Sequence, residues 1–236
     1  MHIQPETPVR EIVLDAPFAI PLFEQHGIDY CCGGAQSLEQ ACQRSGVPVS
    51  ALLDQLASLT HEEATTPEPW LAEPLPSVID HIVDHHHAYA RQQLATILPL
   101  SEKVTARHGR LHPELPQIDE HLRHLDTELS HHFLCEENIL FPAIRRRAGG
   151  HTLLPDVFGN IAQPIARMLL DHEQTGDELR TLRAISNELQ PPADACTSWR
   201  ALYKALRDLE ADLHRHIHLE NNILFPRAQQ RAQEAP

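Results

Sequence analysis

The sequence predicts an all-α protein: an up-down-up-down four-helix bundle preceded by a small helical domain. After residue 76, apolar residues recur at steps of three and four through four long segments. The breaks between these segments are short, which favours antiparallel neighbours. Before residue 63, short helical stretches alternate with proline and glycine, and no period-two alternation competes with them.

The amino-terminal part, residues 1–62, contains four predicted short helices. They begin after Thr7-Pro8, at Ala16-Pro17, at Ser37 and at Ser50. Ser37 and Gln40 have the spacing of a capping box, and glycines at 27 and 46 are typical helix ends. Residues 63–76 are rich in proline and acid but poor in apolar residues, so they are predicted to be a semi-rigid linker.

Residues 77–236 carry the four long helices, which are predicted over residues 77–107, 114–147, 161–189 and 198–233. The second and fourth contain a proline near their ends, Pro142 and Pro226. Proline removes an amide donor and frees a carbonyl one turn earlier, so a kink or unravelling is expected at these two places.

The composition narrows the choice of partners. There are 19 Lys and Arg against 33 Asp and Glu, a net charge of −14, which argues against nucleic acid or an anionic membrane as a partner. No signal peptide or membrane span is visible. Five cysteines do not suggest a disulfide framework, so the expected location is the cytoplasm. The 18 histidines are unusually many and favour metal binding.

One pattern occurs twice, from His132 to Pro142 and from His216 to Pro226, at an offset of 84 residues (216 − 132 = 84). Each copy places a Glu four residues after its His, so both side chains lie on one helix face. These residues, with Ile139 and Ile223 after them, continue the apolar rows of their helices. A buried carboxylate is costly without a compensating charge, so Glu136 and Glu220 are predicted to bind cations.

The first and third helices supply the remaining ligands. Asp84-His-His-His87 and Asp171-His172 lie at the levels of the two repeats if neighbouring helices are antiparallel. The apolar row of the first helix accepts either His86 or His87. Seven further histidines fall off the apolar rows and are expected to face solvent: His81, His85, His121, His124, His131, His214 and His218.

Four imidazoles and two carboxylates can hold two metal ions, with both carboxylates bridging. The ions would keep at least one open coordination position, as a site for small ligands or redox chemistry does. Nitrogen and oxygen ligation favours iron, and manganese and zinc fit as well.

A second motif, Asp29-Tyr-Cys-Cys-Gly-Gly34, lies between two of the short helices. Glycines before a helix can form a concavity of backbone N–H groups, which would lower the pKa of a nearby thiol. Cys31 and Cys32 are therefore candidate reactive residues. Adjacent cysteines can also chelate a metal, form a strained disulfide or simply pack.

The motif from His26 to Gly34, followed by a bundle with two Asn-Ile-Leu-Phe-Pro segments, resembles the di-iron proteins of iron-sulfur cluster repair, the repair of iron centres family. The resemblance implies a hemerythrin-like bundle with two non-haem iron ions, oxo- or hydroxo-bridged. It favours His87 over His86, and it implies a ligand set of His87, His132, Glu136, His172, His216 and Glu220. Cys31 and Cys32 match the cysteine pair of that family.

The resemblance also implies the function: repair of clusters damaged by nitric oxide or peroxide, through iron donation or nitric oxide handling. Its partners would be damaged iron-sulfur proteins and small ligands such as nitric oxide or oxygen, and the amino-terminal domain is a candidate dimer contact. Two alternatives are a di-iron redox enzyme that reduces nitric oxide or peroxide, and a hemerythrin-like carrier or sensor of oxygen or iron.

Overall fold

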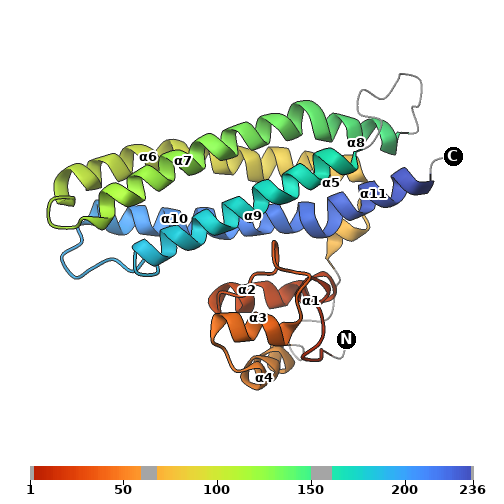
Figure 1. Cartoon of the computed structure of the whole chain (residues 1–236), viewed down its shortest axis with the longest axis horizontal. Helices are drawn as coiled ribbons and strands as arrows, with labels where there is room; N and C mark the ends of the chain where they lie inside the picture. The colour runs from red at the N-terminus through yellow and green to blue at the C-terminus, as the bar shows by residue number, and fades with distance from the viewer. Residues whose placement is uncertain (1–2, 60–67, 150–160, 235–236) are drawn as a thin grey trace. The chain divides into compact units, whose positions relative to one another are not determined.

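The computed structural model describes residues 3–59, 68–149 and 161–234. Within these ranges every regular element is helical, which confirms the predicted all-α class (Figure 1). The connection from Gly150 to Asn160 and the first part of the predicted linker, residues 63–67, lie outside the described residues. The chain forms two compact units, residues 1–78 with 214–236, and residues 79–213.

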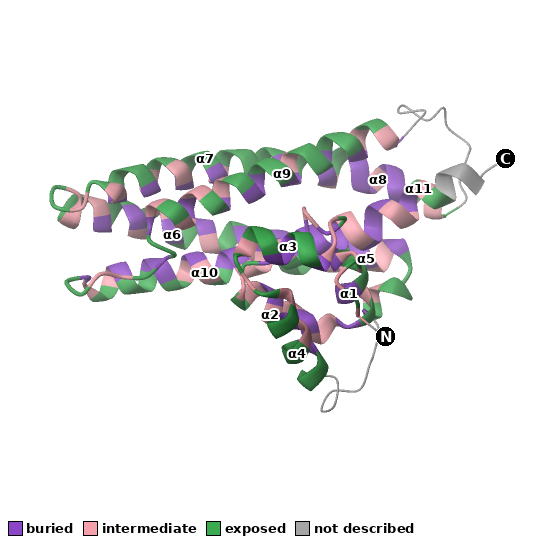
Figure 2. Cartoon of the chain, turned by 60° about the horizontal axis from the view of Figure 1, so that its bottom comes forward, coloured by how far each residue is buried: buried purple, intermediate pink, exposed green. Residues whose placement is uncertain are grey.

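The second unit contains the body of the four-helix bundle. Its long helices are α6 (Ala88–His108), α7 (Glu114–Cys135), α9 (Ala162–Ile185) and most of α10 (Thr197–His218). Figure 1 shows them lying side by side, with a short turn between α6 and α7. Their apolar rows form one core, and the opposite faces of α7 and α9 are exposed in Figure 2.

The first unit contains the short helices α1 (Val9–Asp15), α2 (Ile20–Gln25), α3 (Leu38–Ser45) and α4 (Val49–Leu59). A 3-10 turn, η1 (Pro17–Ala19), precedes α2. Both hydrogen bonds of the capping box between Ser37 and Gln40 are formed. Gly46 ends α3 in the left-handed conformation, at φ 68°. The local signals of the sequence therefore placed these helices correctly.

The third long helix is shorter than predicted. α9 ends at Ile185, whereas the apolar pattern predicted a helix to residue 189. Asn187, Glu188 and Leu189 all have positive φ values, which allow Leu189 to turn back into the core. The Ser186 hydroxyl accepts a hydrogen bond from the Leu189 amide, and Arg207 donates to the Leu189 carbonyl, so these side chains stabilise the left-handed turn.

The structure has π-helical turns where the two prolines predicted a kink. η4 (Glu136–Leu140) leads from α7 into α8 (Phe141–Ala148), and η5 (Leu219–Leu224) leads from α10 into α11 (Phe225–Glu234). In each, the amide before the proline bonds to a Glu carbonyl five residues earlier, Phe141 to Glu136 and Phe225 to Glu220. The disturbance therefore begins at the predicted ligands, not after them. Of the two isoleucines predicted to continue the apolar rows, Ile223 is buried and Ile139 is 40% exposed.

A third π-helical turn, η3 (Ile82–His87), joins α5 (Leu75–His81) to α6. It contains no proline, so the signal that predicted the other two disturbances is missing here. π-helical turns of this kind occur often at functional sites. Here each of the three turns contains a predicted ligand, His87, Glu136 or Glu220.

Candidate metal centre

The predicted ligand side chains are among the most buried polar residues of the chain. His87, Glu136 and Glu220 are fully buried, and His132, His172 and His216 are nearly so. They come from η3, α7, η4, α9, α10 and η5, and they replace apolar residues in the inward-facing rows of these elements. An inward carboxylate in such a row needs a nearby positive charge.

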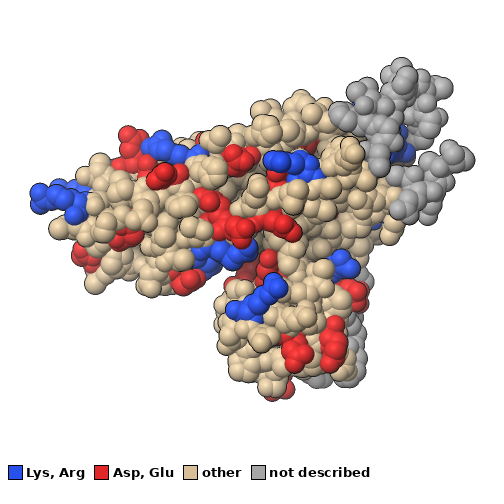
Figure 3. Space-filling model, in the orientation of Figure 1, with Lys and Arg blue, Asp and Glu red and all other residues tan. Residues whose placement is uncertain are grey.

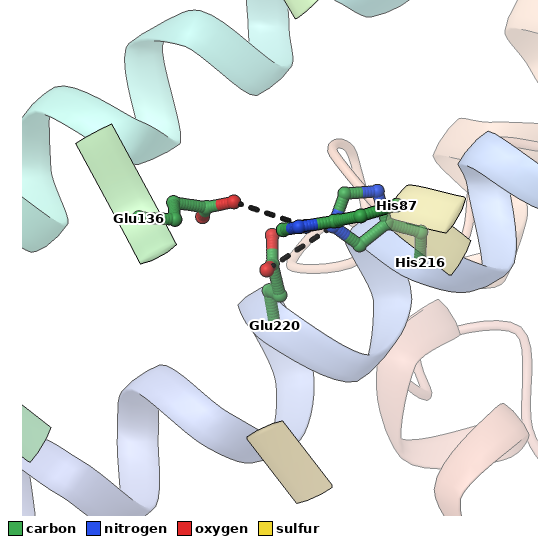
Figure 4. Close-up of side chains that lie close together, drawn as sticks. All are labelled: His87, Glu136, His216 and Glu220. Atoms are coloured by element: carbon green, nitrogen blue, oxygen red, sulfur yellow. Dashed lines mark ion pairs between the residues drawn. The ribbon is translucent and has the colours of Figure 1, made fainter. Parts of the chain in front are cut away.

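The six side chains form two groups with shared members. One group is His87, Glu136, His216 and Glu220, and the other is His132, Glu136, His172 and Glu220. Within each group the ligand atoms lie within 4.8 Å of one another, and both carboxylates belong to both groups. Figure 4 shows the first group with its side chains pointing toward a common point.

The Nε2 atoms face the carboxylates. Nε2 of His87 lies 3.4 Å from Oε2 of Glu136, and Nε2 of His132 lies 3.2 Å from the same oxygen. Nε2 of His216 lies 3.1 Å from Oε1 of Glu220. The donors thus converge on two centres, each with two imidazoles and a share of both carboxylates, which fits a pair of divalent cations.

Glu137 orients the imidazole of His87. The Nδ1 atom of His87 donates to Oε1 of Glu137 at 2.7 Å, and Arg91 donates to the same oxygen at 2.9 Å. Burial raises the pKa of Glu137, but the bonds from Arg91 and His87 outweigh it and keep that pKa below its ordinary value. An ionised Glu137 can only accept, so it keeps the proton on Nδ1 and leaves the Nε2 lone pair for a cation.

Asp171 has a similar position beside His132. Its Oδ2 lies 3.7 Å from Nδ1 of His132, and its Oδ1 forms an ion pair with Arg167 at 2.9 Å. Burial raises the pKa of Asp171, and His132 and Arg167 lower it more strongly, so the net shift is downward. Asp171 precedes the ligand His172 in sequence, but in the structure its carboxylate faces His132.

His86 and His87 point in different directions. His87 joins the centre, whereas Nδ1 of His86 lies 2.9 Å from Oδ1 of Asp212. The apolar row of the sequence did not show which of these two histidines is the ligand. It also did not predict the contacts with Glu137 and Asp212. A signal for Glu137 is present: Arg91 lies four residues after His87, and Glu137 follows the ligand Glu136 directly.

One histidine prediction is wrong. His218 is only 2% exposed, although its position off the apolar row predicted a solvent-facing side chain. Its ring packs edge to face against Tyr30 of the same unit, with 5.7 Å between ring centroids. Burial lowers the pKa of His218 to about 4, so the ring is neutral near neutral pH.

A pocket of about 410 Å³ between α7 and α9 reaches the centre. His132 and Asp171 form part of its wall, and its acidic residues include Glu128, Asp177 and Glu178. Figure 3 shows acidic side chains gathered over α9 on this face. Because one water occupies about 30 Å³, a small molecule or a hydrated cation has room beside His132.

The cysteine motif belongs to the first unit, and none of its residues is a member of either ligand group. Cys31 is 4% exposed and Cys32 is half-buried, with both present as thiols 3.7 Å apart at Sγ. The expected lowering of the thiol pKa is wrong for Cys31. The hydrogen bond with Cys32, burial and the Asp29 carboxylate all raise the pKa of Cys31, because Asp29 occupies the N–H concavity as an acceptor.

The fold and the ligand groups define a helical-bundle cation-binding protein, and comparison with known proteins agrees. Residues 78–228 match the hemerythrin HHE cation binding domain, and residues 5–60 match a domain of unknown function, DUF542. Proteins named iron-sulfur cluster repair protein YtfE from Salmonella schwarzengrund and Escherichia coli O157:H7 are each 37% identical over 224 residues, covering 94% of this chain and 96% of theirs.

A protein of the same name from Escherichia fergusonii is 36% identical with the same coverage. This chain therefore belongs to the iron-sulfur cluster repair protein family, with a hemerythrin HHE cation binding domain. None of the described helices combines the length and the hydropathy that a transmembrane span requires.

The contact between His87 and Glu137 leads to a testable prediction. Glu137→Ala removes the acceptor that fixes the His87 ring, so the affinity for the cation bound by His87 should fall about 10- to 100-fold. Glu137→Gln keeps an acceptor oxygen and should recover part of the loss. Competition with a chelator of known affinity measures both effects.

Glu173→Ala is the matched control, because Glu173 is exposed and adjoins the ligand His172 in sequence. If Glu137→Ala and Glu173→Ala retain cations equally well, Glu137 has no orienting role.

Proposed function

We propose that this chain repairs iron-sulfur clusters damaged by nitrosative or oxidative stress, using a di-iron centre in its bundle. The observation that carries the proposal is the pair of ligand groups that share Glu136 and Glu220. The names of its relatives support it, as does the presence of a cysteine-pair domain in the same chain. We place its action in the cytoplasm, where its five free thiols would stay reduced.

In this proposal His87 and His216 would hold one iron ion, His132 and His172 would hold the other, and Glu136 and Glu220 would be available to both. The mixed nitrogen and oxygen donors favour iron over softer metals. When bound, the iron pair supplies one-electron redox chemistry and binds small ligands at positions that the protein leaves open. Glu137 holds the proton of His87 on Nδ1, so Nε2 of His87 stays available.

As a substrate for transfer, iron must be able to leave the bundle. The pocket between α7 and α9 offers a route, because it reaches His132 and has Glu128, Asp171 and Asp177 along its walls. Carboxylates suit a hard, hydrated divalent cation. The clients would be proteins with damaged clusters, which need iron to be restored.

A second candidate is a redox enzyme that reduces nitric oxide or peroxide. The pocket favours it as well, because its volume beside His132 suits a small substrate. Repair consumes the iron of the chain in proportion to the clusters restored. Reduction leaves that iron in place and, with an external electron donor supplying two electrons per turnover, turns over many times.

The experiment that separates these functions uses an iron-sulfur dehydratase inactivated by nitric oxide. Incubation with the iron-loaded chain should restore dehydratase activity. The iron that the client gains should about equal the iron that the chain loses. The Glu220→Gln variant should restore no dehydratase activity. Free Fe²⁺ with a chelator present is the control for iron that reaches the client through solution. Catalytic loss of nitric oxide without gain of client activity would contradict repair and favour the reductase.

A further inference from the structure

A second cluster of metal-binding side chains lies in the loop between α2 and α3. Asp29, Cys31 and Cys32 each offer one ligand atom, and these atoms lie within 4.8 Å of one another. Asp29 and Cys32 are half-buried, so the cluster opens to solvent on one side. None of the three belongs to the two groups in the bundle.

The spacing of the cluster suits a tetrahedral cation. With metal–sulfur bonds of about 2.3 Å, two thiolates at the tetrahedral angle lie about 3.8 Å apart, and a thiolate and a carboxylate oxygen lie about 3.6 Å apart. The Sγ atoms of Cys31 and Cys32 are 3.7 Å apart, and Sγ of Cys31 is 3.4 Å from Oδ1 of Asp29. The ligands therefore need little movement to bind an ion.

The loop backbone is held in this conformation by its own hydrogen bonds. Oδ1 of Asp29 accepts from the amides of Cys31 and Cys32 at 3.1 and 2.8 Å, which fixes the carboxylate beneath the thiols. Gly34 allows a close approach, because a Cβ there would lie 2.7 Å from the Tyr30 carbonyl oxygen. Preorganised ligands reduce the conformational cost of binding.

Two asparagines of the same unit hold the loop from the other side. Nδ2 of Asn221 donates to the Cys31 carbonyl at 3.1 Å, and Nδ2 of Asn222 donates to the Tyr30 carbonyl at 3.0 Å. Both follow Glu220 in η5. The segment that carries a ligand of the bundle centre thus also positions the cysteine loop.

We propose that Asp29, Cys31 and Cys32 form a second cation site, which binds a borderline divalent ion such as Zn²⁺ or Fe²⁺ through two thiolates and one carboxylate. Binding releases two thiol protons to solvent as two metal–sulfur bonds form. Three ligands leave a fourth position open, where a thiolate of another protein can take over the ion by ligand exchange. Transfer of the ion, as iron, to another protein rests on the proposed function. Binding of a cation by these three residues does not depend on it.

Co²⁺ is a suitable probe, because thiolate ligation gives a sulfur-to-metal charge-transfer band and tetrahedral geometry gives intense visible absorption. We expect the reduced, iron-loaded full-length chain to bind one further Co²⁺ with both signals and to release two protons. Cys31→Ser/Cys32→Ser should lose the charge-transfer band while keeping its helicity and iron content. Cys135→Ser, which removes a thiol from α7, should bind Co²⁺ like the unmodified chain.

Asp29→Asn should keep the band but bind Co²⁺ more weakly, by more than the ~10- to 100-fold that changes outside the ligand shell cost. The proposal is overturned if the reduced chain gives no thiolate band, if the band survives in the double variant or if Cys135→Ser abolishes it. Equal affinity in Asp29→Asn would overturn the three-ligand assignment. A chain that binds Co²⁺ here but repairs no client would contradict the proposed function and leave this site standing.

Discussion

Glu220→Gln is expected to abolish the bundle centre and, in the same step, to stabilise the cation-free protein. Glu136 and Glu220 are fully buried, and their carboxylates lie in one cluster. Two ionised carboxylates in one buried cluster repel, and bound cations offset that repulsion. Glutamine keeps the shape but removes one charge, so iron should fall from about two ions per chain to fewer than one.

The measurements are metal analysis and urea unfolding with and without a chelator. The cation-free variant should be more stable than the cation-free parent, because it no longer holds two ionised carboxylates in one buried cluster. Glu120→Gln, an exposed change on α7, should alter neither quantity. Full iron content with no gain in stability would show that the two carboxylates do not form a shared cation site.

The helices were predictable because their signals are local. A capping box at Ser37, a left-handed Gly46 and apolar rows of period 3.6 each act within about one turn of chain. The end of α9 was not predictable in this way. Leu189 leaves the helical path to pack in the core, and its turn depends on Arg207 from the next helix.

The ligand types were predictable from charge, because a carboxylate in an apolar row needs a partner whatever the details of packing. Their orientation was not. The π-helical turns depend on which carbonyl oxygen accepts the hydrogen bond of each amide. Glu137 and Asp212 contact histidines that belong to other helices. His218 was misplaced for the same reason, since Tyr30, which covers it, is distant in sequence.

The pair His86 and His87 provides the sharpest test of the ligand assignment, because the two residues are adjacent and chemically identical. His87→Ala should lose the cation that it shares with His216, a drop of more than ~100-fold in affinity, since the loss of a ligand exceeds the cost of losing its orienting partner. His86→Ala should keep both cations, because Nδ1 of His86 faces Asp212 instead of the centre.

Metal analysis after dialysis against a weak chelator measures both variants, and unfolding curves show whether either has lost its fold. His86→Ala is expected to lower stability, since it leaves Asp212 without its partner at 2.9 Å. The two variants should therefore separate, one losing cation and the other losing stability. If His86→Ala loses cation and His87→Ala retains it fully, His86 and not His87 is the ligand. The π-helical turn Ile82–His87 would then have to present its other face to the bundle.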